Sequence, residues 1–162
     1  MDGHADVWRL FADADALAAV VEGLARPWRR AGVTHVVGIE SRGFLLGAAV
    51  AVSLGAGFVA IRKGDTSLLP GPKVQTTADE DYRGHRHELR MQSTLTGANR
   101  VLLVDDWAER GSQARAAKDL VTACGAELVG VSVVVDMLAD EVRRALGAVT
   151  ALVTGDELGP SG

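Results

Sequence analysis

The apolar residues of this chain fall into short continuous runs and into stretches with the period of a helix. Leu17, Val20, Val21 and Leu24 follow the i, i+3, i+4, i+7 spacing that forms one apolar face of a helix. Pro27 bends or ends this helix, because proline lacks the backbone N–H that a helix interior needs. Strand-length runs then alternate with helical stretches. This order predicts an α/β fold, a mostly parallel sheet flanked by helices on both faces.

The later elements follow from the same two patterns. Residues 43–54, rich in Ala, Leu and Val, predict a buried helix, and a further helix after residue 111 has an apolar inner face that includes Leu120 and Val121. Strands are predicted at residues 35–39, 57–61, 87–91, 101–104, 127–135 and 149–153.

Residues 63–86 lack apolar periodicity and accumulate Gly, Pro, Thr and Asp. A loop this long inside a compact domain is usually a lid or a binding loop. The whole chain has 162 residues, enough to bury one core without disulfides. We therefore predict a single domain over residues 1–162 with a flexible loop at about 63–86.

Two adjacent carboxylates, Asp105 and Asp106, follow the apolar run 101–104. Such a run is typical of a buried parallel strand, and open α/β sheets bind ligands at the carboxyl ends of these strands. A helix that begins near Gly111 points unpaired N–H groups at the same place, which suits a phosphate. Because carboxylates accept from hydroxyl groups, the pattern favours a sugar phosphate. The alternative is that the two acids only cap the next helix and solvate the strand end.

The segment Gly38-Ile39-Glu40-Ser41-Arg42-Gly43 has the same strand-to-helix character. Gly43 permits a tight turn, the N–H groups of residues 41–44 can face an anion, and Arg42 adds a forked cation. The segment is therefore a candidate site for a second phosphate-like group. Plain architecture is the alternative, because this arrangement with one Arg occurs in many α/β proteins.

Composition and charge exclude several classes of protein. The net charge of -4 gives no basic footprint for nucleic acid. No apolar run reaches membrane-spanning length, and the acidic residues 1–6 lack the apolar core of a secretory signal. Cys124 is the only cysteine, which excludes a disulfide framework, and His85 and His87 lack metal-ligand spacing. We expect a cytoplasmic protein with no nucleic-acid or membrane partner, in which Cys124 is a small buried residue.

Several motifs together resemble one known family. Residues 38–44, 57–63, 69–71, 81–82, 88–89 and 101–106 resemble, in order and spacing, the type I phosphoribosyltransferases, most closely the members that use adenine. The similarity covers about residues 33–135. It implies a Rossmann-like fold, with a shortened hood because only residues 1–13 stand where those members carry a longer one.

The resemblance also implies an activity. Phosphoribosyl pyrophosphate and a nitrogenous base, adenine or a related purine, would give a nucleoside monophosphate and pyrophosphate. Mg²⁺ would take part, held mainly by the substrate rather than by protein ligands. Subunits of this family usually pair, so a homodimer is expected.

Individual roles follow from the same resemblance. Asp105 and Asp106 would hold the ribose 2′- and 3′-hydroxyls, and Asp81 would assist proton transfer at the base. Carboxylates near the ring suit a transition state in which positive charge develops on the sugar. Pyrophosphate would meet Ser41, Arg42 and Lys63. The other expected binding residues are Gly43, Tyr82, Arg86, the 5′-phosphate turn Glu109, Arg110, Gly111, Ser112 and Gln113, and Trp8 as a platform on which the base could stack.

The phosphate turn departs from the family pattern. Residues 109–113 read Glu-Arg-Gly-Ser-Gln where the family has Ala-Thr-Gly-Gly-Thr, so two hydroxyl donors are replaced and a carboxylate is added. A hydrogen bond to a charged group is worth about 1.5–3 kcal/mol. We expect Arg110, Ser112 and Gln113 to replace the lost bonds, together with backbone amides.

Other interpretations stay open at this point. The altered turn favours a non-catalytic regulatory module that binds phosphoribosyl pyrophosphate or a nucleotide on the same fold. An interaction domain without a ligand would leave the ordered motifs unexplained. Trp8 is either a stacking residue or a core residue. The basic stretch that holds Arg83, His85, Arg86 and His87 is either a solvated lid or a contact for pyrophosphate.

Overall fold

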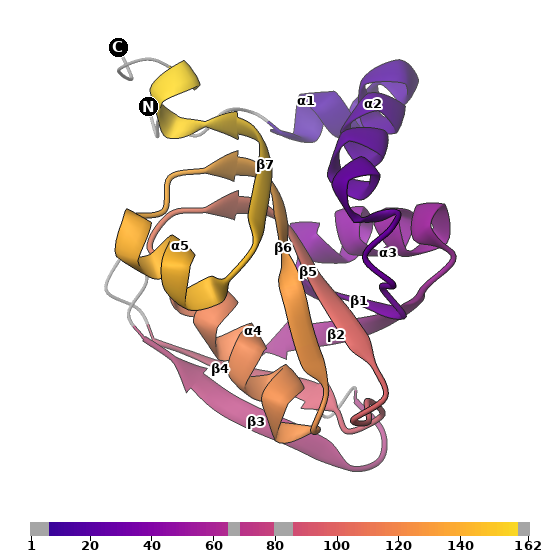
Figure 1. Cartoon of the computed structure of the whole chain (residues 1–162), viewed down its shortest axis with the longest axis vertical. Helices are drawn as coiled ribbons and strands as arrows, with labels where there is room; N and C mark the ends of the chain where they lie inside the picture. The colour runs from indigo at the N-terminus through magenta and orange to yellow at the C-terminus, as the bar shows by residue number, and fades with distance from the viewer. Residues whose placement is uncertain (1–6, 65–68, 80–85, 159–162) are drawn as a thin grey trace.

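The computed structural model of the chain describes residues 7–64, 69–79 and 86–158. Its strands are β1 (His35–Ile39), β2 (Gly57–Lys63), β3 (Lys73–Ala78), β4 (His87–Gln92), β5 (Arg100–Ala108), β6 (Glu127–Asp136) and β7 (Val149–Thr154). They form one sheet in the order β3-β4-β2-β1-β5-β6-β7 (Figure 1). The pairs β2·β1, β1·β5, β5·β6 and β6·β7 are parallel, whereas β4 is antiparallel to β2 and β3. The predicted mostly parallel sheet is confirmed.

Helices cover both faces of the sheet, as predicted. They are α1 (Val7–Ala12), α2 (Ala14–Ala25), α3 (Arg42–Leu54), α4 (Ser112–Ala123) and α5 (Asp140–Leu146), with short 3-10 turns η1 (Arg26–Trp28) and η2 (Gly155–Leu158). Figure 1 shows α2 and α3 on one side of the sheet and α4 and α5 on the other. Two apolar cores result, one under α2 and α3 and one under α4 and α5. Pro27 stands in η1, where the first long helix ends.

The predicted strands are all present, and β5 is longer than its apolar run. Asp105 pairs with Val133 of β6, and Trp107 pairs with Val135. The two acids therefore lie inside the strand rather than after it. Backbone pairing with β6 continues past the point where the side chains become polar. A pattern of apolar side chains cannot predict this extension of the strand.

Part of the stretch predicted as a loop at 63–86 is a strand. Residues 73–78 form β3 and pair along their whole length with β4. The prediction of an irregular loop is wrong for these residues. Because β3 is an edge strand, every second residue is exposed and only Ala78 is fully buried, so the sequence shows no apolar run. The apolar pattern also misses α1 and α5, whose six and seven residues are too few to show a helical period.

Two glycines bring the start of α3 against β1. A Cβ atom on Gly38 would lie 2.1 Å from the carbonyl oxygen of Gly43 and 3.2 Å from the ring of Phe58. The strand and the first turn of the helix thus touch backbone to backbone, which only glycine allows. This contact holds the N-terminus of α3 at the carboxyl edge of the sheet.

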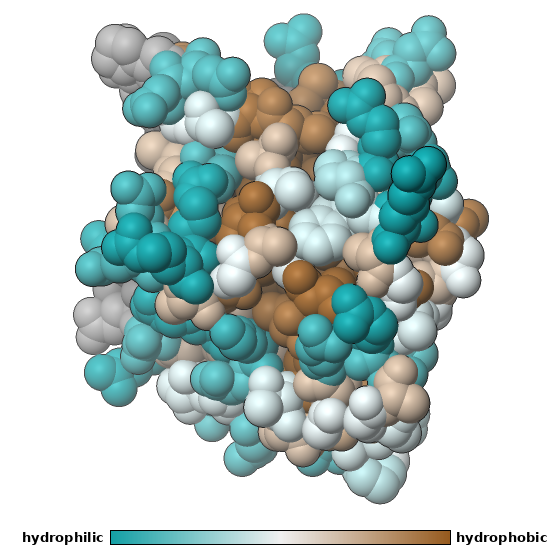
Figure 2. All heavy atoms as spheres, in the orientation of Figure 1, coloured by the Kyte–Doolittle hydropathy of each residue, from teal (hydrophilic) through white to brown (hydrophobic). Residues whose placement is uncertain are grey.

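Figure 2 shows mostly hydrophilic side chains around a central band of apolar ones, over the position of β6 and β7 in Figure 1. All six residues of β7 are only partly buried, because this strand forms one edge of the sheet. Among the described residues, the helices are too short or too polar to cross a lipid bilayer.

Candidate active site at the carboxyl edge of the sheet

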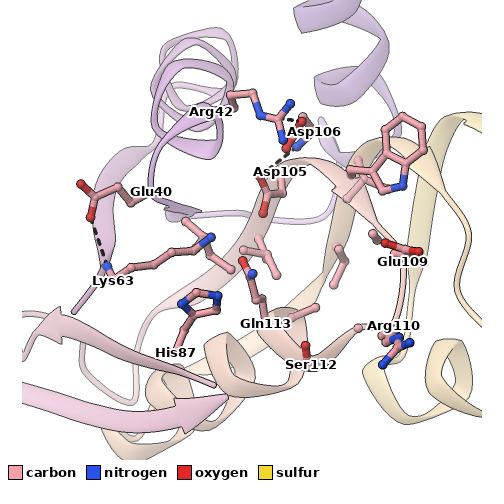
Figure 3. Close-up of a pocket in the computed structure, with 18 of the residues that line it drawn as sticks. Glu40, Arg42, Lys63, His87, Asp105, Asp106, Glu109, Arg110, Ser112 and Gln113 are labelled. Carbon is pink, nitrogen blue, oxygen red and sulfur yellow. Dashed lines mark hydrogen bonds and ion pairs between the residues drawn. The ribbon is translucent and has the colours of Figure 1, made fainter. Parts of the chain in front are cut away.

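One cavity of about 430 Å³ lies at the carboxyl ends of β1 and β5, beside the first turns of α3 and α4 (Figure 3). Its apolar lining comes from Ile39, Leu103, Val131 and Val133, which belong to the core under α4. Charged and polar side chains make up most of the remaining lining. The cavity occupies the position at which open α/β sheets bind their ligands.

Asp105 and Asp106 both line the cavity, but their side chains have different neighbours. Asp105 shares its face with Leu103, which lines the cavity. Asp106 shares its face with Val104, in the core under α3, and its Oδ2 lies 2.9 Å from Nε of Arg42. The two acids are therefore not equivalent: Asp105 lies against Gly43 at the start of α3, whereas Asp106 is ion-paired with Arg42.

The carboxyl of Asp105 is held in a crowded environment. Its Oδ1 accepts a 2.9 Å hydrogen bond from the backbone N–H of Asp106. A Cβ atom on Gly43 would lie 3.0 Å from the same oxygen, so this glycine leaves the room that the carboxyl occupies. Burial raises the pKa of Asp105 well above its ordinary value, the neighbouring Asp106 raises it further, and Lys63 acts in the opposite direction.

Glu40 fixes the corner between β1 and β2. Its Oε1 accepts from Nη2 of Arg62 at 3.0 Å, and its Oε2 accepts from the backbone N–H of Lys63 at 3.1 Å. Its own backbone N–H donates to the carbonyl of Ile61 at 2.9 Å. With the backbone of Lys63 held this way, the Lys63 side chain extends into the cavity in Figure 3. Glu40 therefore helps to orient the ammonium group of Lys63.

The turn at 109–111 leads into α4 without a side-chain cap. Gly111 is the N-cap residue, with a φ of 71°, and no side chain accepts from the first amides of the helix. These amides are free to bind an anion. The interpretation that Asp105 and Asp106 cap this helix is wrong, because both lie inside β5 and the cap is Gly111.

The segment after β6 supports this turn. A Cβ atom on Gly111 would lie 2.4 Å from Cγ1 of Val142, so α5 packs directly against it. The buried Asp136 anchors that segment: its Oδ1 accepts from the N–H of Leu138 at 2.8 Å and its Oδ2 lies 2.7 Å from Nη1 of Arg143. The shape of the phosphate turn thus depends on residues far along the chain.

The structure brings most of the predicted site residues together. Around the cavity stand Ser41, Arg42, Lys63, Asp105, Asp106, Glu109, Arg110, Gly111, Ser112 and Gln113. Gly43 packs behind Asp105. Arg86 is exposed just before β4 and does not line the cavity. Asp81 and Tyr82 lie outside the described residues.

Trp8 does not line the cavity in the described part of the chain. It lies on α1, is 54% exposed, and packs edge to face against Phe11 with ring centroids 5.7 Å apart. The core interpretation of Trp8 is therefore wrong, and its stacking on a base stays a prediction.

The lining residues Trp107 and His87 were not assigned individually from the sequence. Trp107 follows the two acids, and the apolar run ends before it. Its place in the cavity lining becomes evident only because β5 continues to Ala108 in the structure. His87 was part of a basic stretch in which the sequence analysis assigned Arg86, and not His87, to substrate binding. Alternation along β4, with Leu89 and Met91 buried, was the available signal that the His87 side chain faces inward.

The family model of the phosphoribosyl transferase domain matches residues 8–151. The match takes in almost the whole described chain, including every segment that contributes to the cavity, and the chain therefore belongs to the phosphoribosyltransferase family.

Relatives with assigned names agree with this membership. The chain is 42% identical over 155 residues to the adenine phosphoribosyltransferase of a Nocardioides species, covering 92% of this chain and 82% of that protein. It is 39% identical over 132 residues to the adenine phosphoribosyltransferase of Streptomyces coelicolor, covering 82% and 71%. Among solved structures, the APRTase of Giardia lamblia complexed with 9-deazaadenine superimposes with a TM-score of 0.81 at 31% identity, covering 92% of this chain and 84% of that one.

Proposed function

We propose that this protein transfers the phosphoribosyl group of phosphoribosyl pyrophosphate to adenine or a related purine, giving a nucleoside monophosphate and pyrophosphate. One observation carries the proposal: two helix N-termini without side-chain caps border one cavity that also holds an acidic pair. A sugar with a phosphate at each end needs this arrangement. The relatives named above support adenine as the base and purine salvage as the role. Because those relatives are named as enzymes, a non-catalytic regulatory module is not favoured.

The proposed roles follow the distribution of charge. The amides at the start of α4, with Ser112 and Gln113, would hold the 5′-phosphate, and Asp105 and Asp106 would accept from the ribose hydroxyls. As the bond from C1′ to pyrophosphate breaks, its electron pair leaves with a pyrophosphate oxygen. A base nitrogen bonds to C1′ and gives up its proton, for which Asp81 is the expected acceptor. The carboxylates stabilise the positive charge that develops on the sugar. Ser41, Arg42 and Lys63 would bind the departing pyrophosphate.

Two further parts of the proposal concern Mg²⁺ and assembly. Mg²⁺ would be held mainly by substrate oxygens, with Asp105 as a carboxylate nearby. When bound, Mg²⁺ neutralises charge on the leaving group. We also propose a homodimer, for which the exposed apolar side chains of Leu45 and Val52 on α3 are available. The cytoplasmic location and Asp81 as the proton-transfer residue stay predictions.

The activity is tested by incubating the protein with phosphoribosyl pyrophosphate, Mg²⁺ and a panel of purine and pyrimidine bases. We expect pyrophosphate release with adenine or a close purine analogue and only background release with pyrimidines. The measurement is released pyrophosphate together with chromatographic detection of the nucleotide. Binding of phosphoribosyl pyrophosphate without release for any base would favour the regulatory module instead.

The unusual phosphate turn yields a second prediction. Arg110 and Glu109 both line the cavity. We expect Arg110→Ala to weaken ribose 5-phosphate binding about tenfold, the value of one hydrogen bond to a charged group. Glu109→Ala should leave the affinity equal or raise it, because a like charge near the phosphate is removed. Calorimetric titration measures both.

Arg144→Ala, at an exposed position of α5, is the matched control for Arg110. Replacing residues 109–113 by Ala-Thr-Gly-Gly-Thr should preserve or improve the affinity for ribose 5-phosphate. If Arg110→Ala binds like the parent protein and the replaced turn binds no phosphate, the turn does not serve the 5′-phosphate.

A further inference from the structure

His87 is a polar residue at a position where the fold itself calls for an apolar one. Along β4 the side chains alternate, and Leu89 and Met91 are fully buried on the face that packs under α4. His87 is the next residue on that same face. It is partly buried and lines the cavity. The imidazole therefore stands where the apolar face of β4 meets the polar lining of the cavity.

The register of the sheet brings His87 beside Lys63. Lys63 lies directly opposite Leu89 in the antiparallel pairing of β2 with β4, so both point to the same face. His87 stands one step further along that face, where the apolar core ends and the cavity begins. Figure 3 shows the side chains of Lys63, His87 and Gln113 converging on one region of the cavity.

The charges in this region favour an anion. Lys63 reaches it from β2, His87 from β4 and the Gln113 amide from α4. Each of these three side chains carries N–H groups that can donate hydrogen bonds to an anion. The carboxyl of Asp105 on β5 also interacts electrostatically with Lys63 and offsets part of this positive charge. An imidazole supplies at least one N–H donor in either protonation state, so His87 adds a donor beside the ammonium group of Lys63.

We propose that His87 binds the pyrophosphate end of the substrate together with Lys63. The inference rests on the proposed function and adds a residue to it. The structure describes two members of the basic stretch: His87, which lines the cavity, and Arg86, which is exposed outside it. The interpretation of the whole stretch as a solvated lid therefore does not hold for His87.

The test compares three variants by calorimetric titration with pyrophosphate and Mg²⁺, and with ribose 5-phosphate. His87→Leu continues the apolar face of β4, so it keeps the strand while removing the donor. We expect it to weaken pyrophosphate binding about tenfold and to leave ribose 5-phosphate binding within about twofold. His87→Gln retains an N–H donor and should recover most of the lost affinity. Glu88→Gln is the control, because Glu88 is exposed and pairs with Arg90 at 2.8 Å.

Each result decides between the claims. Equal pyrophosphate affinity of the parent protein and a folded His87→Leu variant would overturn the role of His87 and leave the proposed function intact. Equal losses for pyrophosphate and ribose 5-phosphate would mean that His87 only supports the fold of the cavity, which also overturns it. A parent protein that binds neither ligand would instead refute the proposed function, and the role of His87 with it.

Discussion

Asp105→Asn should lower kcat/KM for phosphoribosyl pyrophosphate by about 100-fold or more while the protein stays folded. Each hydrogen bond to a charged group is worth about 1.5–3 kcal/mol, and about 1.4 kcal/mol corresponds to a tenfold change. The asparagine keeps an oxygen that accepts the 2.9 Å bond from the N–H of Asp106. The local structure is therefore retained, and only the charge facing the ribose is lost.

The same variant should be more stable than the parent protein at neutral pH. Burial raises the pKa of Asp105 in the folded state. Its stability contribution is therefore fully present below the carboxyl pKa of the unfolded chain, and it is lost as the pH rises through the raised pKa of the folded state. An asparagine cannot ionise and escapes this loss. We expect a gain of about 0.5–2 kcal/mol in the free energy of unfolding at neutral pH, which shrinks toward zero as the pH falls.

Urea unfolding between acidic and neutral pH measures this difference, and a steady-state assay measures the activity. Asp119→Asn serves as the control, because Asp119 is an exposed carboxylate on α4. It should change neither quantity. An Asp105→Asn protein that is less stable at neutral pH, or that turns over at the parent rate, would contradict the assigned environment of Asp105.

Arg42→Ala should weaken pyrophosphate binding about 30-fold and nucleoside monophosphate binding by only about threefold. Truncating one partner of a buried charge pair costs about 2–5 kcal/mol, and the 33% exposure of the Arg42 side chain places it at the low end. The monophosphate has no pyrophosphate for Arg42 to bind. Its affinity still falls slightly because Arg42 also pairs with Asp106, a residue proposed to hold the ribose. Competition binding with the two ligands measures both changes.

Two controls separate the role of Arg42 in binding from a general loss of charge. Arg42→Lys keeps the charge without the fork, so we expect an intermediate loss. Arg100→Ala removes an arginine that pairs with Glu127 at 2.7 Å, with both side chains largely exposed and outside the cavity lining. It should leave both affinities unchanged. Equal losses for the two ligands in Arg42→Ala would show that the loop at 41–43 does not select pyrophosphate.

The fold class and most of the site were predictable from the sequence, because their signals are local. Apolar runs 35–39 and 101–104, each followed by polar residues and a helical stretch, indicate parallel strands whose carboxyl ends share one edge. The backbone order therefore places Arg42 and Asp105 near each other before any coordinates exist. Strand β3 and helix α5 escaped this reasoning, since edge exposure and short length erase the apolar period.

Tertiary structure alone decided how the residues at that edge divide their roles. Adjacent acids in a sequence look equivalent, yet in the structure Asp105 lies against Gly43, whereas Asp106 is ion-paired with Arg42. His87 joins Lys63 only through the register of β2 against β4, and Gly111 takes its shape from α5, about 30 residues further along the chain. Local sequence determines which residues form strands and turns, whereas the pairing of distant segments determines which side chains meet.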